Sequence, residues 1–74
     1  MITGEHIRTA RKLLSWSQLT LALEANVAPS TVQKFERGES RPSVLCVSTI
    51  KRTLEGAGVE FTEFEPGVRL RSGK

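Results

Sequence analysis

Two short segments of helical periodicity, separated by a connection of only three residues, constrain the fold of this chain most. The first spans about 17–25 and the second about 29–37, with Ser17 suited to cap the first and Gly38 suited to end the second. Asn26 lies between them, and asparagine tolerates a left-handed backbone better than other non-glycine residues. The pattern therefore predicts two short helices joined by a tight turn.

Each segment carries the side chains that a rigid helix pair requires. Ala22 is small where the two helices would cross, and Val32 and Phe35 are apolar anchors on the second helix. The opposite face of that helix is polar and includes Gln33 and Lys34. A pair built in this way can place the polar face of its second helix in the major groove of DNA.

The flanking segments predict two further helices. One spans about 4–14, with Thr3 suited as its N-cap, and the other spans about 43–55. We therefore expect a mainly α-helical, four-helix domain over residues 1–57. Trp16 and Cys46 are interpreted as core residues, and His6 as a surface side chain.

The tail from 58 to 74 changes from helical to alternating periodicity, and a turn signal at 65–67 predicts a β-hairpin. An isolated hairpin is marginal in water, and a chain of 74 residues has a thin core. We therefore expect the hairpin to pair with that of a second copy and to act as the dimerisation element. The side chains expected at this contact are Val59, Phe61, Phe64, Val68 and Leu70.

Leu19 and Leu23 lie four residues apart, so they share one face of the second predicted helix. Two interpretations are open at this point. Either the hairpin folds back and covers these leucines, or they contact a second chain.

Composition bounds the remaining chemistry. The net charge of +3 favours a polyanionic partner. Cys46 and His6 are the only residues of their types, so we expect no disulfide within the chain, no metal site, no cofactor and no enzymatic activity. No apolar run approaches the roughly 20 residues of a membrane span, so we expect a soluble, cytoplasmic protein.

The spacing of several short motifs resembles that of a known family. These motifs are Ser17-Gln18, Leu21-Ala22, Asn26-Val27, Thr31-Val32, Phe35-Glu36-Arg37-Gly38 and Arg41-Pro42. They resemble the phage repressor and Cro type of helix-turn-helix DNA-binding protein, the XRE family, over about 3–55. The C-terminal sequence also resembles a bacterial subgroup of very short members.

The resemblance implies roles for the matching positions. DNA contacts are implied at Gln18, Pro29, Ser30, Gln33, Lys34, Arg37 and Arg41. Among them, Gln18 corresponds to a glutamine that contacts a phosphate, and the two arginines correspond to contacts with the DNA backbone. Arg11 and Glu36 correspond to an ion pair that ties the first helix to the third.

Two positions depart from the family pattern. Ala28 stands where the recognition helix usually has a serine or threonine N-cap. The absence of that capping hydroxyl destabilises the beginning of the helix by about 0.5–2 kcal/mol. Pro29 stands where relatives often carry a polar residue, and it can offer only an apolar contact. Base recognition is therefore expected to concentrate in Ser30, Gln33 and Lys34.

The resemblance and the composition together lead to two functional hypotheses. The first is a homodimeric transcriptional regulator, a repressor, that binds double-stranded DNA sequence-specifically. The alternative is an antitoxin-type protein-interaction module that binds a toxin or other protein partner as well as its own promoter. Non-specific nucleic-acid binding is disfavoured by the modest charge.

Overall fold

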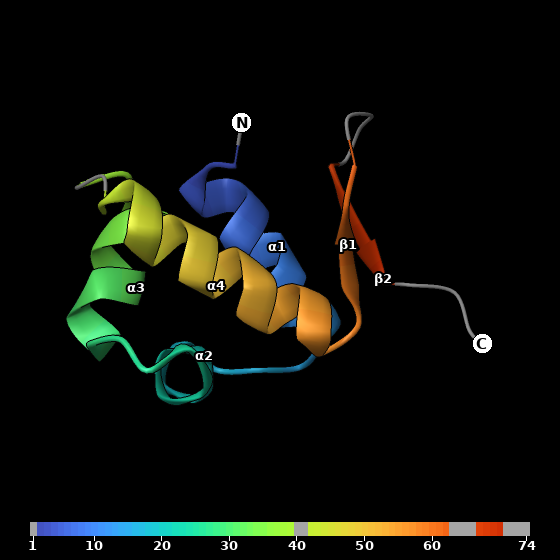
Figure 1. Cartoon of the computed structure of the whole chain (residues 1–74), viewed down its shortest axis with the longest axis horizontal. Coiled ribbons are helices and arrows are strands. Elements are labelled where there is room, and N and C mark those ends of the chain that lie inside the picture. Colours follow the sequence, from blue (N-terminus) through green and yellow to red (C-terminus); the bar gives the residue numbers. More distant parts are fainter. Residues whose placement is uncertain (1, 40–41, 63–66, 71–74) are drawn as a thin grey trace.

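The computed structural model describes residues 2–39, 42–62 and 67–70, and it has four helices followed by a two-stranded hairpin (Figure 1). The elements are α1 (Gly4–Leu13), α2 (Gln18–Ala25), α3 (Pro29–Arg37), α4 (Val44–Gly56), β1 (Val59–Phe61) and β2 (Val68–Leu70). The prediction of a mainly α-helical domain with a C-terminal hairpin is confirmed. The predicted bounds of α3 match those of the structure. The other helices differ by one residue at one or both ends, because Leu14, Ser17 and Ser43 are caps outside the helices and α4 continues to Gly56.

Side-chain caps explain where three of the helices begin. The Thr3 hydroxyl accepts a hydrogen bond from the His6 amide at 3.3 Å, and the His6 ring nitrogen Nδ1 accepts one from the Thr3 amide at 3.0 Å. Ser17 caps α2 and Ser43 caps α4 in the same way, each through its hydroxyl. His6 is thus part of a reciprocal capping box and is partly buried, rather than a simple surface side chain.

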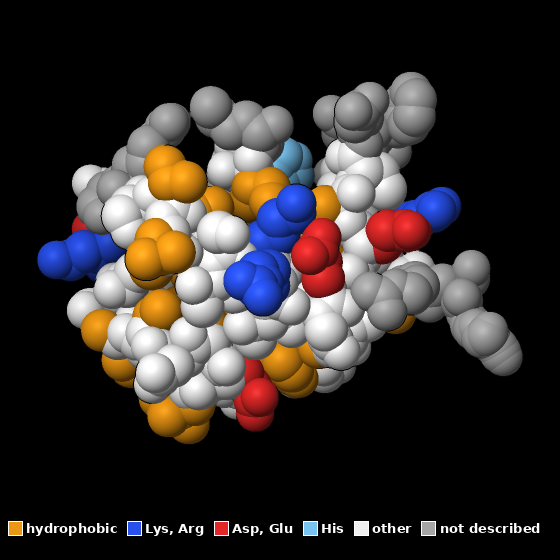
Figure 2. All heavy atoms as spheres, in the orientation of Figure 1, with side chains coloured by type: hydrophobic (Ala, Val, Ile, Leu, Met, Phe, Trp, Pro, Cys, Tyr) orange, Lys and Arg blue, Asp and Glu red, His pale blue; other side chains and the backbone are white. Residues whose placement is uncertain are grey.

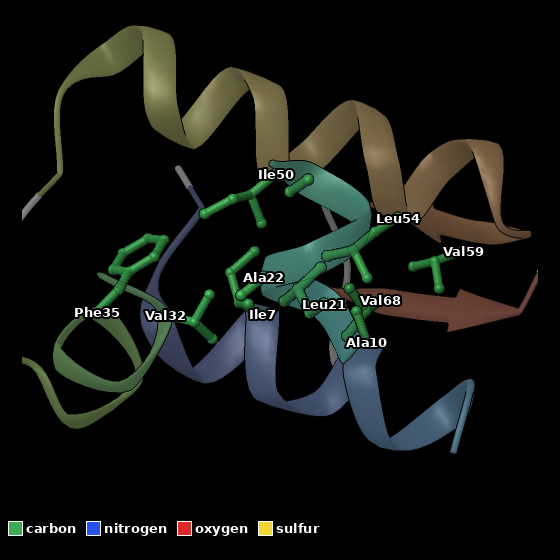
Figure 3. Packing of buried hydrophobic residues seen from close by; sticks show 11 residues of the cluster. Ile7, Ala10, Leu21, Ala22, Val32, Phe35, Ile50, Leu54, Val59 and Val68 are labelled. Atoms are coloured by element: carbon green, nitrogen blue, oxygen red, sulfur yellow. The ribbon is translucent and has the colours of Figure 1, made fainter. Parts of the chain in front are cut away.

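Side chains from all four helices and both strands meet in one core (Figure 3). The fully buried ones are Ile7, Ala10, Leu21, Ala22, Val32, Ile50, Leu54 and Val59. Trp16 and Cys46 are partly buried and pack against this cluster. In Figure 1, α4 runs across the face of the molecule, with α3 near its first residue and the hairpin following its last.

The hairpin packs against its own chain. Its antiparallel register pairs Val59 with Leu70 and Phe61 with Val68, so these four side chains share one face, which contacts α1 and α4. Val59 is 0% and Val68 is 2% exposed. Both are therefore used within the core, which corrects their assignment as contacts for a second chain. Phe64 lies outside the described residues.

The hairpin does not cover the apolar face of α2. Leu19 is 55% and Leu23 is 70% exposed, so the interpretation that the tail folds back over them is wrong. The reason is that the buried face of the hairpin meets α1 and α4 instead.

The beginning of α1 lies unusually close to the backbone of α3. A Cβ atom added to Gly4 would lie 2.0 Å from the carbonyl oxygen of Phe35 and 2.9 Å from the Cα of Glu36. Only glycine allows two backbones to come this near to each other. None of the helices in the described part of the chain is long and apolar enough to span a membrane.

Candidate nucleic-acid interface

The turn between α2 and α3 is set by a left-handed residue. Asn26 ends α2 with φ 59° and ψ 44°, and the following amide, of Val27, donates to the carbonyl of Ala22 at 2.9 Å. Val27 packs against the core, and Ala22 is completely buried. These contacts fix the direction in which α3 leaves α2.

The two faces of α3 differ in chemistry. Val32, Phe35 and Glu36 are buried. The exposed face carries Pro29, Ser30, Gln33, Lys34 and Arg37. Gly38 ends the helix with a left-handed φ of 76°. The buried face therefore anchors the helix in the core, and the opposite face presents a polar and basic surface.

A buried carboxylate joins α3 to α1. The side chain of Glu36 is 1% exposed. Arg11 donates to it through two atoms, Nε at 2.8 Å and Nη2 at 3.0 Å, and Arg8 Nε lies 3.7 Å away. A fork of this kind fixes both distance and orientation, because the guanidinium and the carboxylate are both planar.

The same arginine also holds the connection between α1 and α2. Arg11 Nη1 donates to the main-chain oxygen of Trp16 at 2.9 Å. Its three donors therefore link the end of α1, the loop before α2 and the buried face of α3. The buried side-chain polar atoms of the described residues all have a hydrogen-bond partner.

Gln18 at the start of α2 belongs to the same network. Its Nε2 donates to Glu36 Oε1 at 3.1 Å. An amide nitrogen carries two N–H donors, so this bond uses one of them. The bond to Glu36 orients a side chain whose sequence position resembles that of a phosphate contact.

Comparison with known families places this geometry in a wider group. A family model described as helix-turn-helix (HTH_3) matches residues 7–54 of the 74-residue chain. The match includes the α2–α3 pair, Arg11 and Glu36. The chain belongs to the XRE family of helix-turn-helix proteins. As a member of this DNA-binding regulatory family, it is a DNA-binding transcription regulator. No curated protein matches the chain.

In this XRE-family protein, the residues expected to contact DNA divide into three groups. Ser30 and Lys34 line a shallow depression with Ser43 and Cys46, where α3 meets the start of α4. Pro29, Gln33 and Arg37 are exposed on α3, and Arg37 Nε lies 3.3 Å from a Glu39 carboxylate oxygen. Gln18 is partly buried at the start of α2. Arg41 lies outside the described residues.

The recognition helix lacks a side-chain cap. Ala28 occupies the N-cap position with φ −68° and ψ 139°, and it makes no side-chain hydrogen bond to the first turn. Pro29 follows at the first helical position, where its missing amide costs nothing. The helix is therefore held by its buried face and by Glu36 rather than by its beginning.

Two features near this surface were not predicted from the sequence. The bond between Gln18 and Glu36 joins residues that lie 18 positions apart and meet only after α1, α2 and α3 have packed. The second feature is the exposure of Val44 and Leu45, which are 87% and 78% exposed at the start of α4.

Proposed function

We propose that the chain is a sequence-specific, dimeric repressor that acts in the cytoplasm and inserts α3 into the major groove of its DNA site. One observation carries the proposal. The exposed side chains of Ser30, Gln33 and Lys34 stand on a nine-residue helix whose opposite face is fixed by the core and by Glu36. Such a helix can read bases without first ordering itself.

The chemistry of the exposed residues suggests distinct roles. Lys34 can donate to O6 and N7 of guanine, and Gln33 can form a pair of hydrogen bonds with adenine. Ser30 can bond to several bases, whereas Pro29 can only touch a thymine methyl. We assign phosphate contacts to Gln18 and to the arginines at positions 37 and 41.

Selection of binding sites from random double-stranded DNA tests this assignment. Lys34→Ala should relax the preference at one base position by about 1–3 kcal/mol. Gln18→Ala should weaken all sequences alike, because a phosphate contact carries no base information. Lys12→Ala is the matched control, since it removes the same charge from an exposed position on α1. Equal losses on selected and random DNA from Lys34→Ala would contradict base recognition by this residue.

The repressor role has a separate test. In an in-vitro transcription assay, the protein should lower transcript from a promoter that overlaps the selected site. Increased transcript would identify an activator instead.

The exposed leucines of α2 favour a second candidate function, an antitoxin-type module. Leu19 and Leu23 form an apolar face that nothing in the described chain covers. If the adjacent gene encodes a small protein, co-expression should give a stoichiometric complex, and Leu19→Gln with Leu23→Gln should abolish it. A complex that is unaffected by both substitutions would remove this face from consideration.

A further inference from the structure

Two arginines share the buried carboxylate of Glu36. Arg11 Nε lies 2.8 Å from one of its oxygens, and Arg8 Nε lies 3.7 Å from the other. The other ion pairs found among the described residues join one cation to one carboxylate, as Arg69 joins Glu60. On the face shown in Figure 2, basic and acidic side chains likewise lie together over α4. The two arginines and their carboxylate therefore carry a net positive charge that this cluster does not neutralise.

The carboxylate has no free position for a hydrogen bond from Arg8. Glu36 Oε2 accepts from Arg11 Nε, and Oε1 accepts from Arg11 Nη2 at 3.0 Å and from Gln18 Nε2 at 3.1 Å. A carboxylate oxygen has two lone pairs, so both of those on Oε1 are used. The 3.7 Å between Arg8 Nε and Oε1 exceeds the length of a hydrogen bond. Charge thus holds Arg8 near Glu36, while its N–H donors stay unused within the described part of the chain.

Arg8 and Gln18 approach the same oxygen from different helices. The separation of Arg8 Nε and Gln18 Nε2 therefore cannot exceed their 3.7 Å and 3.1 Å distances to Glu36 Oε1 taken together. Two N–H···O bonds of about 2.9 Å each, made to one phosphate group, span a gap of this size. The side chain of Arg8 is 46% exposed, against 14% for Arg11. Arg8 is therefore the arginine of this cluster that a phosphate beside Gln18 can reach.

We propose that Arg8 and Gln18 bind the same phosphate of the DNA backbone. Arg8 donates through its guanidinium, and Gln18 donates through the amide N–H that its bond to Glu36 leaves free. This inference rests on the proposed function, because it adds a second donor to the phosphate contact assigned there to Gln18. Glu36 is a positioning residue, since it holds the two donors side by side without touching DNA. The planar fork of Arg8 suits a phosphate group, to which arginine can donate two parallel bonds.

The shared carboxylate also favours DNA over another source of phosphate. Glu36 belongs to α3, so it fixes the position of Arg8 and Gln18 relative to the exposed face of that helix. A helix inserted in the major groove has backbone phosphates on both sides of it, and contacts to them set the orientation of the protein. A clamp tied to α3 would thus set the angle at which Gln33 and Lys34 meet the bases.

The test measures the salt dependence of DNA binding by Arg8→Met, which removes the charge and keeps much of the aliphatic stem. Each neutralised phosphate contributes about 0.9 to the slope of log K against log salt. We expect the slope to fall by this amount, so the loss of affinity should be about threefold larger at 50 mM than at 200 mM salt. The loss should be equal on a selected and on a random duplex, because a phosphate carries no base information.

Three further variants separate this contact from other effects of charge. Arg52→Met is the matched control, since it removes the same charge from an exposed position on α4 and should leave the slope unchanged. Arg8→Lys should keep the wild-type slope, because an ammonium group can also neutralise a phosphate. Combining Arg8→Met with Gln18→Ala tests the shared phosphate. The combined loss should be at least about twofold smaller than the product of the single losses, since donors to one group depend on each other.

Several results would overturn the proposal. An unchanged slope for Arg8→Met would exclude the contact, and an equal decrease for Arg52→Met would attribute it to overall charge. Single losses that simply multiply would place Arg8 and Gln18 on separate phosphates. A lower urea midpoint for Arg8→Met with an unchanged slope would make Arg8 a structural partner of Glu36 alone. If no DNA sequence is selected, the proposed function fails, but the slopes on random duplex still decide whether Arg8 contacts a phosphate.

Discussion

Replacing Gly4 with alanine should destabilise the fold, even though alanine is the better helix former. The added Cβ would lie 2.0 Å from the Phe35 oxygen, and both that oxygen and the nearby Glu36 Cα belong to the backbone. A side chain cannot rotate away to relieve this contact, so α1 and α3 must separate by more than 1 Å. Overpacking of this kind costs roughly 1–3 kcal/mol or more, against a total stability of about 3–5 kcal/mol for a core of this size.

Gly56→Ala is the matched control. Gly56 also lies in a helix, at the last position of α4, but a Cβ there would meet nothing within 4 Å. Alanine should therefore stabilise the chain by about 0.5 kcal/mol through helix propensity and a less flexible unfolded state. Urea unfolding, followed by far-ultraviolet circular dichroism, measures both changes. A Gly4→Ala protein as stable as the wild type would refute the close approach of α1 to α3.

Three further predictions concern stability and can be measured in the same unfolding assay. Ala28→Ser should stabilise the chain by roughly 0.5–2 kcal/mol, because it supplies the side-chain cap that α3 lacks; no gain would show that the first turn of α3 is satisfied in another way. Glu36→Leu should cost roughly 3–5 kcal/mol by leaving Arg11 without its carboxylate, and adding Arg11→Met should recover most of the loss. Val68→Ala should cost about 2 kcal/mol, since this side chain is buried against the core; a negligible cost would indicate that the hairpin does not pack on the helices.

Local signals were sufficient to predict the helices and the turn between them. Ser17 acts through its own hydroxyl, and Asn26 and Gly38 act through their own left-handed backbone, so their positions alone indicate where helices begin and end. The packing of the hairpin could not be predicted in this way. Alternation shows that Val59 and Val68 share a face, but it does not show which surface that face will meet.

The candidate interface was only partly predictable for the same physical reason. Helical periodicity places Gln33 and Lys34 opposite Val32 and Phe35, and the structure shows the first pair exposed and the second buried. The bond from Gln18 to the buried carboxylate depends on three helices meeting, for which spacing along the chain carries no signal. Helical periodicity gave a weak indication that Leu45 is exposed, because a residue two positions before Val47 points to the far side of a helix.

The buried carboxylate network separates the residues that hold α3 from those that would choose a DNA sequence. Glu36 anchors the helix from its buried side, whereas Ser30, Gln33 and Lys34 are exposed on the other. Exchanges at such exposed positions usually change stability by less than about 0.5 kcal/mol. If these three residues read the bases as we propose, new operators can be acquired by drift at three positions while the fold is conserved. On the same proposal, the 74-residue chain is a frame for retargeting, with a three-position library as its natural starting point.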